Sequence, residues 1–307
     1  MQITFSEFLK KVRNTRKLTQ QEVIDLLIES DDVFSKLDLT TFSRWERGVT
    51  SPKLARQLLV ARIMGEDVAL LIDPEAKPAM KKVTNFEQIR LRVRNPYSSD
   101  VTPFTTHHYK SLSDQSALRN KLMTFHQDYL GMNVNLSDFD HPNLMLDVFI
   151  DSSGVLIGHL LYGYLDTSKL DSGYVPSLLS ECDFLQPKEH TNTNLTLYVI
   201  SVYSALASPR MVIVLMLLDI LRQNNNIRYL QANCHDQEGY AFYESNSDCE
   251  LTSKGPSLPF GGVKVYGKHF RYVRIKTNTE SLLACALFSE MLPFTHDYIQ
   301  KLLNRSS

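Results

Sequence analysis

The segment Leu39–Gly48, LTTFSRWERG, is the stretch that most strongly constrains the N-terminal fold of this chain. Asp38 is a suitable N-cap for a helix here, and the final glycine is a suitable residue to end it. Phe42 and Trp45 then fall on one face of the helix. The other face carries hydroxyl groups and one guanidinium, which belong to Thr40, Thr41, Ser43 and Arg44. Such groups can bond bases or phosphates in a major groove, so the segment predicts a recognition helix for double-stranded DNA.

A second helix is expected upstream, beginning after Thr19, whose side chain can cap it. Gln20 and Gln21 lie at its N-terminus, where side-chain amides and backbone N–H groups can hold a phosphate. LTQQEV followed by FSRWERG and TSP resembles the lambda-repressor-like (XRE or Cro/C1-type) helix-turn-helix family, over about the first seventy residues. The resemblance implies helices at Phe5–Thr15, Gln20–Glu29, Leu39–Arg47, Pro52–Met64 and Glu66–Ile72.

The chain departs from the family pattern at IESDDVFSKLD, which lengthens the turn before the recognition helix by about eight residues. Asp31 and Asp32 in this insertion would be repelled by phosphate, so we expect the loop to lie away from DNA. The alternative is an ordinary small helical domain with solvated arginines. In either case we expect Trp45 in the core, and Glu46 and Arg47 in an ion pair or a backbone contact.

The composition is typical of a soluble globular protein with room for two domains. The chain has 307 residues, of which 43% are hydrophobic, and a net charge of −1 at pH 7. Residues 1–72 contain eleven Lys or Arg and ten Asp or Glu. A DNA footprint would therefore be local, and a homodimer would strengthen it.

The four cysteines have neither the short paired spacing of a zinc site nor the density of a secreted disulfide scaffold. The most apolar run, Met211–Leu218, is far shorter than the ~20 residues that span a bilayer. We therefore expect a cytoplasmic protein with no signal peptide, no membrane insertion, no metal site and no resident cofactor.

Residues 73–106 are expected to form a linker and a first strand. In NFEQIRLRVRNPYSS, apolar residues alternate with Arg90, Arg92 and Arg94, which predicts a strand with either a solvated face or an auxiliary phosphate contact. His107 and His108 are neighbours that point to opposite sides of a strand or helix, so they do not form a metal pair.

The remainder of the chain alternates strands and helices. We expect a helix in LSDQSALRNKLMTFHQDYLG, a hairpin that turns at Asp151–Gly154 and a strand in NLTLYVISVYS. A helix with Ser208 as N-cap, the strand IRYLQANC and the helix EGYAFYESN follow. This order resembles the GCN5-related N-acetyltransferase (GNAT) fold. The predicted fold class is therefore multidomain: an all-α helix-turn-helix domain (1–72), a linker (73–106) and an α/β GNAT-like domain (107–307).

The cofactor loop of the GNAT family is an Arg/Gln-x-x-Gly-x-Gly/Ala motif, whose glycines let backbone N–H groups approach the pyrophosphate of acetyl-CoA. The corresponding residues here are ALASPRMV, where Ser208, Arg210 and Val212 replace small residues and Pro209 removes one donor. Arg210 could still attract a phosphate. Tyr243 matches the family's general-acid tyrosine by position, with packing against the sheet as the alternative. We therefore assign no catalytic residue, and expect the domain to have lost acetyl transfer.

The GNAT resemblance also implies a cleft where two central strands part, which could take an acyl chain or another small ligand. Residues expected near this cleft are Tyr162, Tyr164, Tyr198, Tyr203, Arg210 and Tyr243, with His159 beside them. Core or surface positions are the alternative for each of them. The apolar tail from Thr279 should form a helical pair broken near Pro293, which either closes the core or forms a dimer seam.

Together these features predict a sequence-specific DNA-binding transcriptional regulator, a homodimer, whose GNAT-like domain senses a ligand or mediates dimerisation. One alternative is an active acyl-CoA-dependent N-acyltransferase that a helix-turn-helix domain targets. Another is an antitoxin-like autorepressor and protein-interaction module. A thermal shift with acetyl-CoA would favour the first alternative, and a stoichiometric partner would favour the second.

Overall fold

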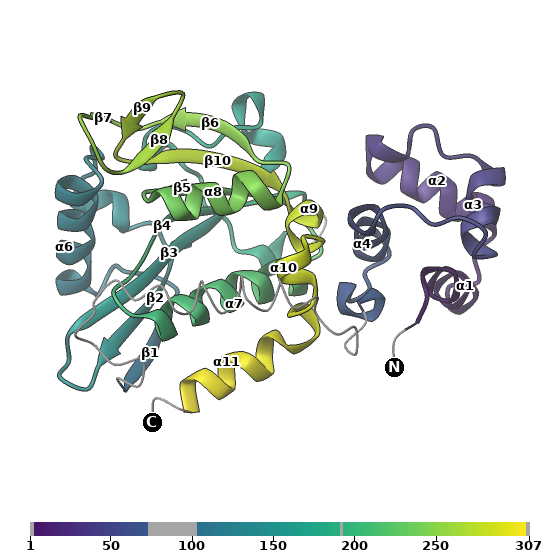
Figure 1. Ribbon diagram of the computed structural model, residues 1–307, viewed down its shortest axis with the longest axis horizontal. Helices are drawn as coiled ribbons and strands as arrows, with labels where there is room; N and C mark the ends of the chain where they lie inside the picture. The colour runs from purple at the N-terminus through teal and green to yellow at the C-terminus, as the bar shows by residue number, and fades with distance from the viewer. Residues whose placement is uncertain (1–2, 73–102, 191–192, 305–307) are drawn as a thin grey trace.

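The computed structural model describes residues 3–72, 103–190 and 193–304. The N-terminal part is helical, and the rest is an α/β fold with helices on both faces of a sheet (Figure 1). The helical part contains α1 (Phe5–Thr15), α2 (Gln20–Ser30), η1 (Asp32–Phe34), α3 (Leu39–Glu46), α4 (Leu54–Ile63) and η2 (Val68–Leu71). The strand predicted with Arg90, Arg92 and Arg94 lies outside the described residues.

Capping residues set the starts of α2 and α3, as predicted. The Thr19 side chain accepts the Glu22 N–H at 3.2 Å, and Asp38 accepts the Thr41 N–H at 2.6 Å. Trp45 is 6% exposed and packs against other aromatic rings, which confirms its place in the core.

The fifth predicted helix, Glu66–Ile72, is instead the single 3-10 turn η2. The Asp67 carboxylate accepts the Ala69 N–H at 2.9 Å, and the Leu70 N–H bonds to the Asp67 carbonyl in the i to i+3 pattern of that turn. These bonds hold Val68–Leu71 as a 3-10 turn in place of the longer α-helix that was predicted.

The α/β part contains a seven-stranded sheet in the order β1-β2-β3-β4-β5-β10-β6. Its strands are β1 (Phe104–Tyr109), β2 (Met145–Asp151), β3 (Leu156–Asp166), β4 (Leu195–Ser204), β5 (Ile227–Cys234), β6 (Glu250–Lys254) and β10 (Val273–Asn278). Only the β4–β5 pair is parallel among these described strands. The predicted hairpin is confirmed: Asp151 accepts two N–H groups of the turn, and Gly154 has a φ of +79°.

The strands after α8 (Gln237–Asn246) were not predicted from the sequence. β10 pairs antiparallel with both β5 and β6, so it lies between them. A second sheet in the order β7-β9-β8 is formed by β7 (Ser257–Leu258), β8 (Val263–Val265) and β9 (Lys268–Phe270).

Helices cover the two faces of the large sheet. One face packs on α6 (Ser116–Thr124), which continues as the π-helical turn η3 (Phe125–Tyr129). The other face packs on α7 (Ala207–Gln223) and α8. Short 3-10 turns lie in the connections, at η4 (Leu136–Phe139), η5 (Thr167–Lys169), η6 (Asp171–Gly173), η7 (Leu179–Glu181) and η8 (Pro187–Glu189).

The N-terminus of α7 differs from the prediction. Leu206 is its N-cap, and Ser208 lies inside the first turn. The Ser204 hydroxyl instead organises the connection from β4, because it accepts the Leu206 N–H at 3.3 Å and donates to the Leu206 carbonyl at 2.6 Å.

The tail forms four short pieces rather than one helical pair. They are α9 (Thr279–Leu283), α10 (Ala286–Ser289), η9 (Leu292–Phe294) and α11 (Thr295–Asn304). Leu282, Leu283 and Leu292 are at most 2% exposed and belong to the main core, so the tail closes that core.

The N-terminal helices contact the α/β part through a buried cation, Arg62 of α4. Its guanidinium donates to the Leu221 and Ile227 carbonyls, each at 2.5 Å, and to the Asn224 carbonyl at 2.9 Å. It also pairs with Glu280 of α9 at 2.8 Å. The end of α7 and the start of α9 therefore depend on a residue from the helical part.

Candidate functional site

The parallel strands β4 and β5 part at their carboxyl ends. They pair from Leu195 to Val199 of β4, and the remainder of β4 has no register partner on β5. Side chains from the β5 end fill part of this gap: Asn233 donates to the Ile200 carbonyl at 2.9 Å, and His235 bonds the Val202 carbonyl. Such a gap between parallel strands commonly opens into a ligand site.

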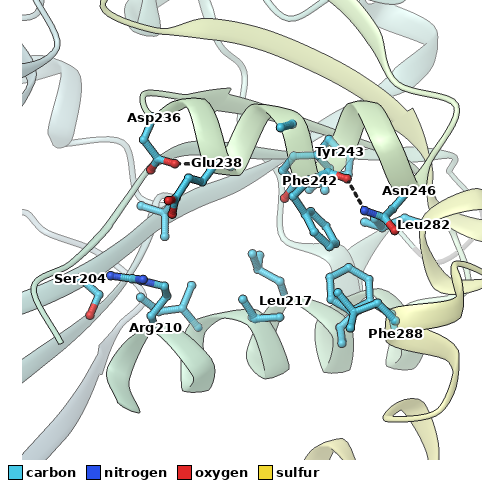
Figure 2. Close-up of a pocket in the computed structure, with 18 of the residues that line it drawn as sticks. Ser204, Arg210, Leu217, Asp236, Glu238, Phe242, Tyr243, Asn246, Leu282 and Phe288 are labelled. Carbon is cyan, nitrogen blue, oxygen red and sulfur yellow. Dashed lines mark hydrogen bonds between the residues drawn. The ribbon is translucent and has the colours of Figure 1, made fainter. Parts of the chain in front are cut away.

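A cavity of about 490 Å³ lies beside this gap, between α7 and α8. Figure 2 shows it bounded by α7 on one side and α8 on the other, with the C-terminal helices at one end. Its volume is within the ~300–1,000 Å³ typical of small-molecule sites. The splayed strands, two helices and the tail therefore build one concave site.

One end of this cleft is polar. Arg210, in the first turn of α7, points toward Ser204, and Asp236 and Glu238 lie across from it at the start of α8 (Figure 2). Arg210 is the only Lys or Arg that lines the cleft within the described part of the chain. Asp236 is the N-cap of α8 and accepts the Gly239 N–H at 2.7 Å, so its carboxylate is held at that helix N-terminus.

The other end is apolar. Leu217 of α7, Phe242 of α8, Leu282 of α9 and Phe288 of α10 surround it, and the Phe242 and Phe288 rings lie 4.9 Å apart between centroids (Figure 2). A ligand that fills the cleft must therefore combine a polar group with a hydrocarbon part.

Tyr243 also lines the cleft from α8. Burial raises the pKa of its hydroxyl, with smaller contributions from Cys234 and Cys249. The hydroxyl therefore stays protonated at neutral pH and is a weaker acid than an exposed tyrosine. Cys234 of β5 interacts with this hydroxyl and does not line the cleft, in keeping with the alternative expected from the sequence, packing against the sheet.

Three imidazoles cluster around Phe125 near the splayed strand ends. The Phe125 ring lies 4.7 Å from His159 and 6.2 Å from His235 between centroids, and His126 follows it in η3. Burial lowers the pKa of His126 to about 4 and that of His159 to about 3. His159 therefore stays neutral and bonds the Ser201 hydroxyl at 2.9 Å. This cluster was not predicted, because its members are far apart in sequence.

The structure brings together three of the six residues expected in the pocket, namely Tyr203, Arg210 and Tyr243. Tyr162 and Tyr164 lie on β3, which β4 separates from β5, so they do not reach this cleft. Tyr198 faces the opposite side of the sheet, where its hydroxyl accepts from Arg274 at 2.7 Å and from Asn233 at 2.9 Å.

The residues predicted to contact DNA differ in exposure and in whether their side chains are already hydrogen-bonded. Gln20 donates its amide to Glu46, which also pairs with Arg13 at 2.6 Å, and Gln21 donates to Asp25 at 2.8 Å. Both side-chain amides are therefore bonded to carboxylates of the helical part itself. Thr40 and Arg44 are exposed, whereas Thr41 and Ser43 are half-buried, all on α3.

No protein-family model and no curated protein matches the chain. One similar solved structure is Arabidopsis thaliana NAA60 in complex with acetyl-CoA, at 9% identity, 57% of this chain, 98% of that chain and a TM-score of 0.34. The AHL synthase LasI matches at 12% identity, 60% of this chain, 95% of that chain and a TM-score of 0.32. FeeM, an N-acyl amino acid synthase from uncultured soil microbes, matches at 15% identity, 62% and 99% coverage and a TM-score of 0.37.

The residues after the helical region form the predicted mixed α/β sheet, and the predicted helical region is present. The prediction of a DNA-binding transcriptional regulator is wrong: the matched structures are an acetyl-CoA complex, an AHL synthase and an N-acyl amino acid synthase. No comparison supports an XRE domain, DNA as a partner or a homodimer. Within the described residues, no helix is long and apolar enough to cross a membrane, and no group of three potential ligand side chains could hold a metal.

Proposed function

We propose that the chain is an acyl-CoA-dependent N-acyltransferase. The observation that carries this proposal is the cleft between α7 and α8, which joins a polar end at the splayed strands, where Arg210 faces Asp236 and Glu238, to an apolar end. An acyl thioester has the same division, because its hydrocarbon chain is apolar and its carrier is phosphorylated. The substitutions in ALASPRMV argue for a changed mode of phosphate binding, with a side chain replacing some backbone donors.

Arg210 is the group in this proposal that binds phosphate. A guanidinium is always charged and can bond two phosphate oxygens at once. Its position in the first turn of α7 adds the partial positive charge of the helix N-terminus. The guanidinium and the helix N-terminus together replace the backbone donors that the missing glycines would expose to a phosphate. One backbone donor of this region, the Leu206 N–H, is already bonded to the Ser204 hydroxyl.

The proposed reaction begins with attack of a neutral amine on the thioester carbonyl. The C–N bond forms, the C–S bond breaks, and the sulfur leaves with the electron pair of that bond. Tyr243, which lines the cleft and matches the general-acid tyrosine of the GNAT family by position, is the proposed proton donor to the leaving sulfur. The amine loses its proton to solvent or base as the amide forms.

Binding and turnover of acyl-CoA test the proposal. Purified protein is titrated calorimetrically with acetyl-, octanoyl- and palmitoyl-CoA, and thiol release is then followed with a panel of primary amines. We expect saturable binding, and about tenfold weaker binding for Arg210→Ala. Arg56→Ala removes an exposed guanidinium of α4 and should bind like the wild type. Absence of binding to all three thioesters would overturn the proposal.

The finer domain assignments are also proposals. The order and bounds of α1 to α4 support a helix-turn-helix-like arrangement of residues 1–72, joined by a linker to an acyl-transfer domain at 107–307. A homodimer and a cytoplasmic location remain predictions. Light scattering of the purified chain tests the dimer directly.

A further inference from the structure

A second cavity of about 370 Å³ lies against the other side of α7. Val212, Met216 and Ile220 face this second cavity, whereas Ile213, Leu217 and Leu221 face the acyl cleft. Residues four apart stack on one helical face, so α7 separates two sites. The remaining walls of the second cavity come from β1, β2, β3 and α11.

A buried carboxylate, Asp147 of β2, lies in this second cavity and is 3% exposed. One of its oxygens bonds His108 Nδ1 at 2.9 Å. Its Oδ2 atom is buried and accepts no hydrogen bond in the described structure, although the Tyr162 hydroxyl of β3, which lines the same cavity, lies near enough for Asp147 to raise its pKa. A buried carboxylate oxygen without a donor is costly, so this atom is suited to receive a hydrogen-bond donor from a ligand.

The charge of the second cavity favours a cation. Two carboxylates line it, those of Asp147 and Asp219, together with the imidazoles of His107 and His108, and no Lys or Arg does so among the described residues. Asp147 raises the pKa of His108, so a protonated His108 offsets one of the two negative charges. Asp219 already accepts from the Thr295 hydroxyl at 2.8 Å and from the Gln223 amide at 2.6 Å. Asp147 is therefore the carboxylate with bonding capacity left for a ligand.

The wall opposite the carboxylate is apolar. Besides the three α7 residues, Ile299 and Leu303 of α11 line it, one helical turn apart. A hydrated metal ion or a small hydrophilic cation would leave these side chains without contacts. A ligand with a cationic head and a hydrocarbon group satisfies both walls.

We propose that the second cavity binds a protonated alkyl or aryl amine. The ammonium group donates to Asp147 Oδ2, and the hydrocarbon part packs against Met216, Ile299 and Leu303. Because α7 separates this cavity from the acyl cleft, the bound amine is a distinct ligand and not the acceptor in acyl transfer. The inference therefore does not depend on the proposed acyltransferase activity.

Calorimetry of the full chain with n-hexylammonium chloride, in the absence of any acyl donor, tests the proposal. Hexanoate and 1-hexanol serve as matched ligands that lack the positive charge. We expect saturable binding of hexylammonium alone, and a loss of about ten- to a hundredfold for Asp147→Asn, which removes the charge with little change in shape. Asp25→Asn removes the same charge from the surface of α2 and should bind like the wild type.

A second variant, Ile299→Phe, fills the apolar part of the second cavity and should also weaken binding, while circular dichroism confirms that it folds. Equal affinity of wild type and Asp147→Asn would overturn the proposal, as would binding of hexanoate as tight as that of hexylammonium. Failure to bind any of the three ligands would overturn it as well, and would leave the acyl-CoA titrations unaffected.

Discussion

At the residue scale, His126 couples stability to pH. It is 0% exposed, donates from Nδ1 to the Leu122 carbonyl at 2.7 Å, and has its pKa lowered by burial to about 4. Below its ordinary pKa of about 6.5, the unfolded chain binds a proton that the folded chain refuses until about pH 4. Stability contributed by neutral His126 is therefore present above pH 6.5 and is lost as the pH falls toward 4.

We expect urea unfolding of the wild type to show a loss of several kcal/mol between about pH 7 and pH 4.5, to which His126 and His159 both contribute. His126→Asn keeps a donor for the Leu122 carbonyl but removes the titration. Its unfolding free energy should therefore fall less steeply with acid than that of the wild type. An unchanged slope would show that another group controls this pH range.

Tyr243 is the second residue for which a specific effect is expected. Tyr243→Phe removes the hydroxyl that we propose protonates the leaving sulfur, so kcat should fall about a hundredfold while KM for acyl-CoA changes little. Tyr240→Phe is the matched control, because Tyr240 lies on α8, bonds Glu244 at 3.0 Å and does not line the cleft. Steady-state thiol release measures both variants, and equal kcat for Tyr243→Phe and the wild type would remove Tyr243 from the mechanism.

At the element scale, β3 is held closely against the segment that follows η7. A Cβ atom added at Gly163 would overlap the ring of Phe184, which is 1% exposed. We expect Gly163→Ala to lower the free energy of unfolding by about 1–3 kcal/mol, as overpacking does in a core. In a Phe184→Leu background the same change should cost less, which a double-mutant cycle in urea would measure. Additive costs would contradict the overlap.

The elements that the sequence predicted well carry local signals. Thr19 and Asp38 cap their helices, and Asp151 and Gly154 make the turn of a hairpin, so each boundary follows from a few adjacent residues. The strands β6, β7 and β9 carry no clear alternation. In β10, Val273 and Ile275 alternate with Arg274 and Lys276, but its place between β5 and β6 depends on pairing with residues distant in sequence. Such pairing leaves no local pattern.

The part of the candidate site that the sequence predicted is the part that follows from the order of strands and helices along the chain. Tyr203 lies near the end of β4, Arg210 in the first turn of α7 and Tyr243 in α8, all of which the chain order predicted. The error for Tyr162 and Tyr198 arose because aromatic content indicates neither the strand neighbour nor the face of the sheet. The partners of Asp147, His159 and Arg62 come from other elements, and only the folded chain reveals them.

At the scale of the whole molecule, the buried Arg62 joins the helical and α/β parts. Arg62→Met leaves Glu280 without its nearest cation and three carbonyls without their donor, so we expect a loss of about 3–5 kcal/mol. Trp45, the only tryptophan, reports on the helical part, and circular dichroism reports on the whole chain. The two signals should change together with urea in the wild type and separate in the variant.

Two comparisons make this interface prediction specific. Arg56→Met changes an exposed arginine of the same helix and should leave both transitions unchanged. The double variant Arg62→Met, Glu280→Leu removes both charges and should recover part of the lost stability. Coincident, unshifted transitions for Arg62→Met would mean that this contact does not join the two parts.

The position of Arg62 and Glu280 in the chain also has a consequence for biosynthesis. The ribosome makes Arg62 long before the carboxylate that it pairs with, Glu280, and before the strand β10 that joins β5 to β6. Long-range closure of this kind slows folding and leaves the cationic helix and the open β5 edge exposed on the nascent polypeptide. The Arg62–Glu280 pair and the pairing of β5 with β10 can therefore form only after Val273–Glu280 has been synthesised, so the helical part and the strands made before it wait for this segment.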